Sequence, residues 1–98
     1  MNVMINGIGF SVKPSLDEFI TKKLSKLAKY NEDLQSLTVT LKLEKDDATG
    51  NKLAEVSMIV KGCNPVFASK SSQNFEDDID ELYDILKRQL IKLKEKNG

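Results

Sequence analysis

A single apolar stripe runs through the last quarter of the chain and constrains the fold more than any other pattern. Apolar residues recur there at three- and four-residue steps over roughly six helical turns, at Phe75, Ile79, Leu82, Leu86, Leu90 and Leu93. Ser71 or Ser72 is placed to cap the start of this helix. Because only one side of the helix is apolar, it must lie on another layer of structure.

A second amphipathic helix is expected near the amino terminus. Pro14 suits a first-turn position, and Ser15 with Glu18 three residues later suits a capping box. The helix should therefore begin between Pro14 and Leu16, and the pattern leaves open which cap operates. Its apolar stripe comprises Leu16, Phe19, Ile20, Leu24, Leu27 and Ala28, and the run Asn31-Glu32-Asp33 ends it.

Four segments have the features of strands. Residues 37–45 alternate almost perfectly between apolar and polar. Turn residues at 46–51 and a second alternating run at 54–61 predict a hairpin. Residues 2–6, ending at Gly7-Ile8-Gly9, form a first strand, and residues 66–70, after a turn at 62–65, form a fourth.

The order of these segments defines the fold class. At 98 residues the chain has the size of one domain, spanning residues 1–98. The order β-α-β-β-β-α predicts an α+β two-layer sandwich with a four-stranded mixed sheet. Since the strands have only one apolar side, both helices should cover the same face of the sheet.

Composition argues against catalysis. The chain contains no histidine, the commonest general base and metal ligand, and Cys63 is its single cysteine. The carboxylates from Glu76 to Asp84 lack the spacing of a calcium loop, and Gly7-Ile8-Gly9 lacks the third glycine of a dinucleotide-binding loop. We therefore expect no enzymatic activity, no catalytic residues, no metal and no cofactor.

Membrane association is not predicted either. The sequence has no apolar run of about 18 residues, and residues 1–10 lack the cationic start and apolar stretch of a signal peptide. The sequence therefore predicts a cytoplasmic protein without a membrane partner.

Charge is balanced over the whole chain but segregated along the last helix. Lysine and arginine total 15, as do aspartate and glutamate. On this helix the acids come first, at Glu76, Asp77, Asp78, Asp80, Glu81 and Asp84, and the bases last, at Lys87, Arg88, Lys92, Lys94 and Lys96, interrupted by Glu95. Favourable interaction with the helix dipole explains part of the pattern but fades within one turn. Asp80 and Lys92 are about 18 Å apart along the axis, beyond a Debye length of about 8 Å, so the basic end acts as a separate surface.

Lysines also gather on the first predicted helix. Lys22, Lys26 and Lys29 lie opposite its apolar stripe, and Lys23 flanks the stripe. A solvated helix face is the usual explanation for such lysines. Two helices on one sheet face, however, would bring both basic segments together in a groove that suits a row of phosphates.

Three segments together resemble a known family. They are LDEFITKKLSKLAKY at residues 16–30, LKLEK at 41–45 and LKRQLIKLKEK at 86–96. In these segments and in the order of its elements, the chain resembles the short ribosome hibernation promoting factors, also called the ribosome-associated inhibitor or sigma-54 modulation protein family. The resemblance covers essentially the whole length.

The resemblance implies a function without chemistry. It implies a bacterial protein that enters the small ribosomal subunit when growth slows and inhibits translation by occupying the RNA-lined decoding channel. The implied partner is the small subunit with its ribosomal RNA, and no DNA or membrane is expected. Whether the protein forms a homo-oligomer, and whether it pairs ribosomes or holds single ones idle, stays open.

The resemblance also implies an RNA-binding surface. By position, the matching cations are Lys23, Lys26 and Lys29 on the first helix and Arg88 and Lys92 on the last, with Lys42, Lys45 and Lys96 matching less closely. The chain departs from the family at Lys13, where a capping threonine is frequent, and at Asp78, where a small residue is common.

A protein-binding module is the alternative hypothesis. The same fold could bind another chain, or a second copy of itself, through its acidic surface or a free strand edge without binding ribosomes. Ile59, on the otherwise polar side of the sheet, could belong to such a contact.

Overall fold

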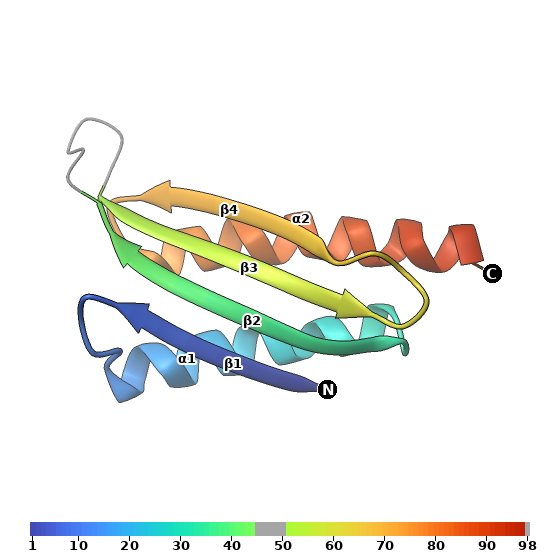
Figure 1. The fold of residues 1–98 in the computed structure, drawn as a ribbon, viewed down its shortest axis with the longest axis horizontal. Coiled ribbons are helices and arrows are strands. Elements are labelled where there is room, and N and C mark those ends of the chain that lie inside the picture. Colours follow the sequence, from blue (N-terminus) through green and yellow to red (C-terminus); the bar gives the residue numbers. More distant parts are fainter. Residues whose placement is uncertain (45–50, 98) are drawn as a thin grey trace.

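The predicted order of elements is confirmed by a computed structural model, which describes residues 1–44 and 51–97, with only the backbone at 96 and 97 (Figure 1). The elements are β1 (Asn2–Ile8), α1 (Pro14–Ser25), the 3₁₀ helix η1 (Lys26–Tyr30), β2 (Leu34–Leu43), β3 (Lys52–Val60), β4 (Val66–Ser72) and α2 (Phe75–Asn97). None of the helices in this part of the chain combines the length and apolarity needed to cross a bilayer.

The four strands form one mixed sheet in the order β1-β2-β3-β4. β1 pairs with β2 in parallel, whereas β3 pairs antiparallel with both β2 and β4. Figure 1 shows α1 and α2 side by side behind the sheet, running in the same direction. The predicted two-layer sandwich with both helices on one face is confirmed.

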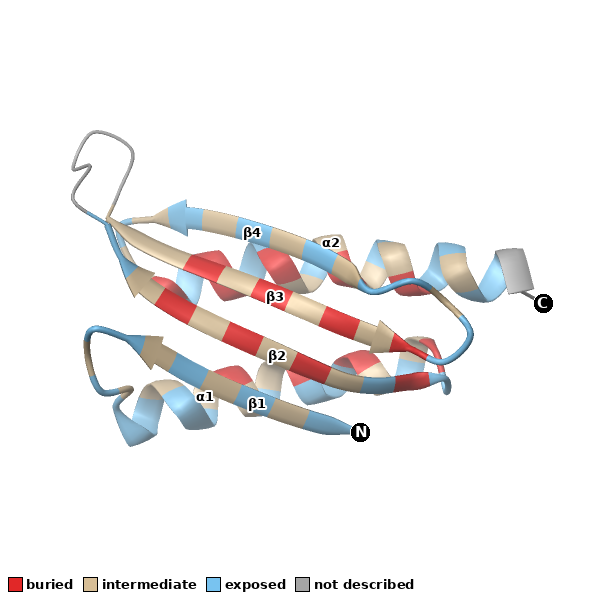
Figure 2. Cartoon of the chain, viewed as in Figure 1, coloured by how far each residue is buried: buried red, intermediate tan, exposed pale blue. Residues whose placement is uncertain are grey.

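The core lies between this sheet face and the two helices. Figure 2 shows buried residues alternating along β2 and β3, the two central strands. On the helices, the buried apolar residues are Ile20, Leu24, Leu27, Phe75, Ile79, Leu82, Leu86 and Leu90, all within the predicted stripes. The amphipathic patterns therefore predicted the packing surfaces correctly.

Asp78 is a charged residue within this apolar layer. It is 1% exposed, and neither of its carboxylate oxygens has a hydrogen-bond partner among the described residues. The pKa of this carboxyl group is raised to about 6, mainly by burial and with smaller contributions from the nearby acids Glu81 and Asp77. A hydrogen bond from the Ser72 hydroxyl would lower this pKa, but that hydroxyl already donates its proton to the Asn74 carbonyl oxygen at 2.6 Å.

The start of α2 corrects a prediction from the sequence. Neither Ser71 nor Ser72 caps the helix, because both belong to β4, where they pair with Leu53 and Lys52. Asn74 is the cap instead: its side-chain oxygen accepts from the Asp77 backbone N–H at 2.8 Å. Asparagine is as good a cap as serine, so extending the strand to Ser72 costs the helix nothing.

The first helix begins at Pro14, as predicted, but without a side-chain cap. The capping box of Ser15 and Glu18 therefore does not form. The α-helix ends at Ser25, and the segment continues as a 3₁₀ helix to Tyr30 before Asn31 turns into extended backbone.

Gly7 has a different role from the one predicted. β1 continues through Gly7 to Ile8, and the turn begins at Gly9, whose φ is 82°. A Cβ atom at Gly7 would lie 2.7 Å from the Phe10 carbonyl oxygen and 2.9 Å from a Val12 methyl carbon. Gly7 thus permits close packing of the following loop. The turn predicted at 46–51 falls almost entirely outside the described residues, but the antiparallel pairing of β2 with β3 confirms the hairpin.

Candidate nucleic-acid interface

The parallel helices bring η1 against the middle of α2. Asn31, which follows η1, is buried, and its side-chain amide donates to the Leu90 carbonyl at 3.3 Å. Its side-chain oxygen accepts from the Asp33 backbone N–H at 2.9 Å. These bonds hold the end of η1 on α2, where the basic half of α2 begins.

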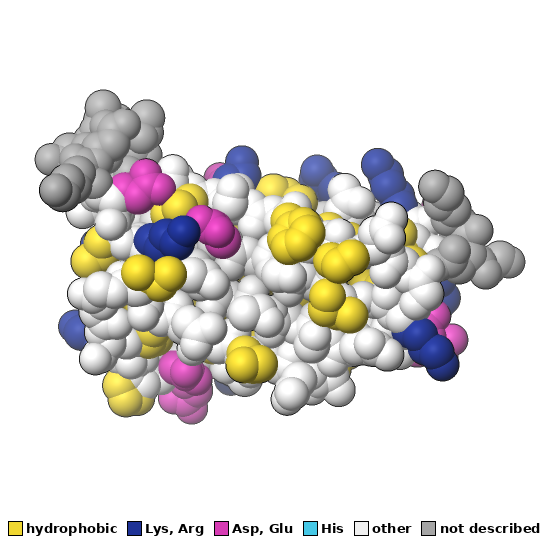
Figure 3. Space-filling model, viewed as in Figure 1, with side chains coloured by type: hydrophobic (Ala, Val, Ile, Leu, Met, Phe, Trp, Pro, Cys, Tyr) yellow, Lys and Arg dark blue, Asp and Glu magenta, His cyan; other side chains and the backbone are white. Residues whose placement is uncertain are grey.

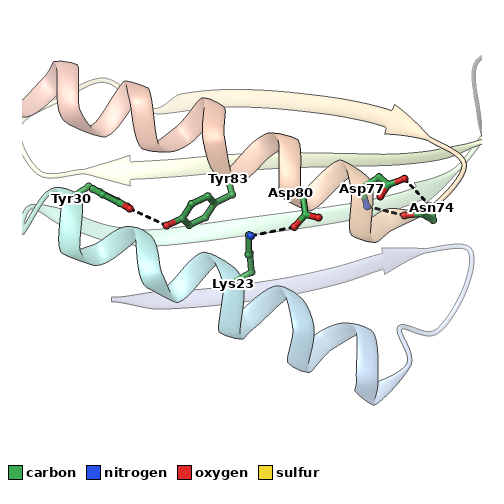
Figure 4. A network of polar contacts seen from close by, with 6 residues as sticks. All are labelled: Lys23, Tyr30, Asn74, Asp77, Asp80 and Tyr83. Carbon is green, nitrogen blue, oxygen red and sulfur yellow. Dashed lines mark hydrogen bonds and ion pairs between the residues drawn. The ribbon is translucent and has the colours of Figure 1, made fainter.

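A pair of tyrosines joins the two helical segments at this point. The Tyr30 hydroxyl on η1 lies 3.2 Å from the Tyr83 hydroxyl on α2 (Figure 4). Their rings meet edge to face, with centroids 6.4 Å apart and planes at 71°. This geometry is favourable for aromatic pairs, so the contact fixes η1 relative to α2.

Three lysines from three elements surround this pair. The ammonium nitrogens of Lys29 and Lys87 lie 5.2 and 5.1 Å from the centroid of the Tyr30 ring. The ammonium nitrogen of Lys23 lies 4.9 Å from the centroid of the Tyr83 ring. All three are within the range of cation–π attraction. We call Lys23, Lys29, Tyr30, Tyr83 and Lys87 the tyrosine–lysine cluster.

The cluster shifts the two hydroxyl pKa values in opposite directions. The hydrogen bond with Tyr83 lowers the pKa of Tyr30, and the charges of Lys29 and Lys87 lower it further. The hydrogen bond with Tyr30 raises the pKa of Tyr83 to about 12, with smaller contributions from burial and from Asp84. Negative charge is therefore better tolerated on the Tyr30 oxygen than on the Tyr83 oxygen.

Acidic residues of α2 make ion pairs with neighbouring elements. Asp80 lies 3.3 Å from the ammonium nitrogen of Lys23 on α1 (Figure 4), and Glu81 lies 3.8 Å from that of Lys70 on β4. Both pairs are partly exposed, so each stabilises the fold by only about 0–1 kcal/mol. The Asp80 pair also offsets the charge of Lys23, which was predicted to bind RNA.

The other predicted helix cations do not all face the cluster. Lys26 on η1 and Arg88 and Lys92 on α2 are exposed. Arg88 and Lys92 follow Glu81 by seven and eleven residues, so they lie on the face of α2 that Glu81 presents towards β4. The two helices are side by side as predicted, but the cation of α2 that meets η1 is Lys87.

Lys87 and the two tyrosines were missed as site residues. Lys87 was recognised only as part of the charge pattern. Its spacing from Asp80 and Tyr83, seven and four residues, places all three on the side of α2 that faces α1 and η1. This spacing was the available signal, but the direction of that side becomes evident only from the packing.

The less closely matching cations lie elsewhere. Lys42 is on the sheet face opposite the helices, where its ammonium nitrogen lies 3.1 Å from a carboxylate oxygen of Glu55. It is therefore not part of the helical surface. Lys45 and the side chain of Lys96 fall outside the part of the chain that the structure describes.

The outer face of the sheet carries few charges, and its apolar side chains lie partly in a small group and partly singly (Figure 3). Phe67 is 75% exposed and borders a shallow hollow of about 400 Å³ lined with hydroxyl groups, including those of Thr38, Thr40 and Ser57. In the strand register, Met4 and Phe67 are separated by Thr38 and Ser57. Polar residues thus separate the exposed apolar side chains of the two edge strands.

Comparison with solved structures identifies the same fold in other proteins. A ribosomal subunit interface protein from Coxiella burnetii matches with a TM-score of 0.83 at 22% identity, covering 96% of this chain and 98% of the other. The N-terminal domain of Protein Y from Thermus thermophilus matches with a TM-score of 0.80 at 22% identity, covering 95% and 99%. At these identities the likeness shows the fold alone.

Sequence comparison shows the family. A ribosome hibernation promoting factor of Escherichia coli K12 is 34% identical over 96 residues, and one of Klebsiella oxytoca is 32% identical. Each match covers 98% of this chain and 96% of the relative. The family model described as Sigma 54 modulation protein / S30EA ribosomal protein matches residues 3–97. The chain therefore belongs to the Sigma 54 modulation protein / S30EA ribosomal protein family.

Proposed function

We propose that this protein is a non-enzymatic ribosome-binding protein that inhibits translation under stress or slow growth by occupying the RNA-lined decoding channel of the small ribosomal subunit. The observation that carries the proposal is the gathering of cations from α1, η1 and α2 on the helical layer of a chain whose relatives are named ribosome hibernation promoting factors. A ribosomal partner makes the bacterial cytoplasm its place of action, without a membrane or DNA partner.

The shape and charge of the molecule support this proposal. The body measures 43 × 26 × 18 Å, so it is long and narrow enough to lie along a groove. Lysine and arginine bind RNA mainly through its phosphates, which requires a basic strip and no deep pocket. The proposed RNA contacts are Lys23, Lys26, Lys29, Lys87, Arg88 and Lys92, with Lys42, Lys45 and Lys96 as further candidates.

Sedimentation with small ribosomal subunits tests the proposal. The wild-type protein should travel with the subunit at low salt and dissociate as salt rises, because binding to phosphates releases counterions. Lys26→Glu combined with Arg88→Glu should weaken binding by at least about tenfold, since it places two negative charges against RNA. Both side chains are exposed, so the free energy of unfolding should change by less than about 1 kcal/mol.

The matched control reverses two lysines at the end of the molecule where α1 and α2 begin. Lys13 precedes α1 and Lys52 begins β3, and both line the same surface hollow. Lys13→Glu with Lys52→Glu changes the net charge by the same amount and should weaken binding much less. If the wild-type protein never travels with the subunit at low salt, the ribosome proposal is wrong.

A second candidate function is a protein-binding or self-associating module that no longer binds ribosomes. The observation in its favour is that Phe67, Met4 and Ile8 on the outer sheet face are each more than half exposed. We rank it second because hydroxyl residues separate these apolar side chains. Association through such a surface would lose little strength as salt rises, which distinguishes it from phosphate binding.

A further inference from the structure

Tyr30 lies where the basic segments of η1 and α2 meet. Lys29 precedes it on η1, and Lys87 reaches the same ring from α2, each ammonium nitrogen about 5 Å from the ring centroid, at 5.2 and 5.1 Å. The distance between the two ammonium nitrogens therefore cannot exceed the sum of these two distances. An anion attracted to both is brought next to the Tyr30 side chain.

The hydroxyl pair leaves one proton for a further acceptor. Each tyrosine hydroxyl has one proton to donate, and Tyr30 and Tyr83 share a single hydrogen bond of 3.2 Å. Lys29 and Lys87 stabilise negative charge on the Tyr30 oxygen, whereas Asp84 acts in the opposite sense on Tyr83. This setting favours Tyr83 as the donor and Tyr30 as the acceptor. The proton of Tyr30 is then available to a group from outside.

We propose that Tyr30, Lys29 and Lys87 bind one phosphate group of an RNA backbone, with the Tyr30 hydroxyl donating to a non-bridging oxygen. The inference rests on the proposed function, since it specifies one contact of the same RNA-binding surface. A backbone phosphate presents oxygens that accept hydrogen bonds from tyrosine and lysine, and two ammonium groups offset its charge. Lysine side chains are flexible enough to turn from the ring towards a phosphate.

Lys23 and Tyr83 act as positioning residues in this site. The ammonium group of Lys23 is held between Asp80, at 3.3 Å, and the Tyr83 ring. It thereby keeps the Tyr83 ring beside Tyr30 and has less charge to offer to RNA. The phosphate site is therefore centred on Tyr30, away from Lys23.

Two isosteric variants test the site. Tyr30→Phe removes the proton that would reach the phosphate, whereas Tyr83→Phe removes only the donor to Tyr30. Both lose the same hydroxyl–hydroxyl bond, so a purely structural role would affect them equally. We expect Tyr30→Phe to weaken binding to the small subunit by about five- to tenfold, and Tyr83→Phe by about twofold or less. Equal losses, or no loss for Tyr30→Phe while the wild type binds, would overturn the site but leave the proposed function standing.

A titration with the RNA hexauridylate tests the site without ribosomes. Nuclear magnetic resonance should show the Tyr30 ring signals shifting in the wild type, and shifting clearly less in Lys87→Ala than in the control Lys13→Ala. If the wild type does not bind small subunits, the proposed function fails. The titration then decides about the site alone: a shift centred on Tyr30 supports it, and unchanged Tyr30 signals overturn it.

Discussion

At the scale of single residues, Asp78 shows how one side chain can limit the stability of a well-packed domain. Its carboxyl group is buried on α2 near Ser72 of β4, and no described residue offers it a hydrogen bond in place of water. Because the pKa of Asp78 is about 6 in the folded protein and 3.8 in the unfolded chain, the two states differ in protonation between these pH values. In that range the folded protein keeps a proton on Asp78 that the unfolded chain has released. The contribution of this group to stability is therefore most favourable below the ordinary value and is lost as pH rises through 6.

We predict that Asp78→Ala stabilises the protein near neutral pH. The buried charge costs on the order of 2–3 kcal/mol, and losing an acid from the first turns of a helix costs about 0.3–1 kcal/mol. The net gain in the free energy of unfolding should be about 1–2 kcal/mol, and it should shrink as pH falls from about 7 towards 4.5. Urea denaturation at several pH values measures it.

Asp84→Ala is the control for this variant. Asp84 is an exposed acid on the same helix, so its loss should change stability by less than about 0.5 kcal/mol at every pH. A gain for Asp78→Ala that does not vary with pH would show that the Asp78 carboxylate is solvated or paired in solution.

At the scale of elements, the cap of α2 can be tested by experiment, because the structure assigns it to Asn74 and the sequence predicted a serine of β4. We predict that Asn74→Ala destabilises the protein by about 1 kcal/mol, because the side chain that accepts from the Asp77 N–H is lost. Ser71→Ala should change stability by less than about 0.5 kcal/mol, since Ser71 is exposed and lies in β4. Thermal unfolding measures both; a larger loss for Ser71→Ala would restore the cap predicted from the sequence.

Helices and strands were predictable from the sequence where the apolar residues followed a single period. The stripe from Phe75 to Leu93 and the alternation from Leu37 to Leu41 each had one dominant period, so both the element and its buried face were predicted correctly. Leu43, predicted on the same side of β2, is 50% exposed. The ends of helices and strands were less predictable, because residues there suit two kinds of structure at once. Ser72 suits both a strand and a cap, and only the pairing of Ser72 with Lys52 decides between them.

At the scale of the whole molecule, acids of α2 offset part of the positive charge on the helical layer, as Asp80 does for Lys23. We predict that Asp80→Asn tightens binding to small subunits by about two- to fivefold, because it frees Lys23 from its ion pair. Its stability should fall by at most about 1 kcal/mol. The dependence of the dissociation constant on salt should also become steeper.

Glu76→Gln is the matched control, since Glu76 is an exposed acid of α2 and its loss changes the net charge equally. If both variants tighten binding to the same extent, total charge matters and the Lys23–Asp80 pair does not.

The site was predictable only in outline. The sequence indicated which segments were basic and that both helices share one sheet face. It did not indicate how far each helix is rotated about its axis. That rotation turns Lys87 towards Tyr30 and turns Arg88 and Lys92 towards the side of β4. The rotation of α2 is set by packing of its stripe against β3 and β4, which involves residues far apart in the sequence.

The parallel course of the two helices has a consequence for how the protein approaches a partner. Acids gather near the start of α2, whereas Lys26 and Lys29 on η1 and the bases of α2 gather towards its end. A molecule with zero net charge is not pulled as a whole towards a polyanion, but unequal ends experience a torque in its field. Close to an RNA surface, the protein should therefore turn so that η1 and the end of α2 arrive first.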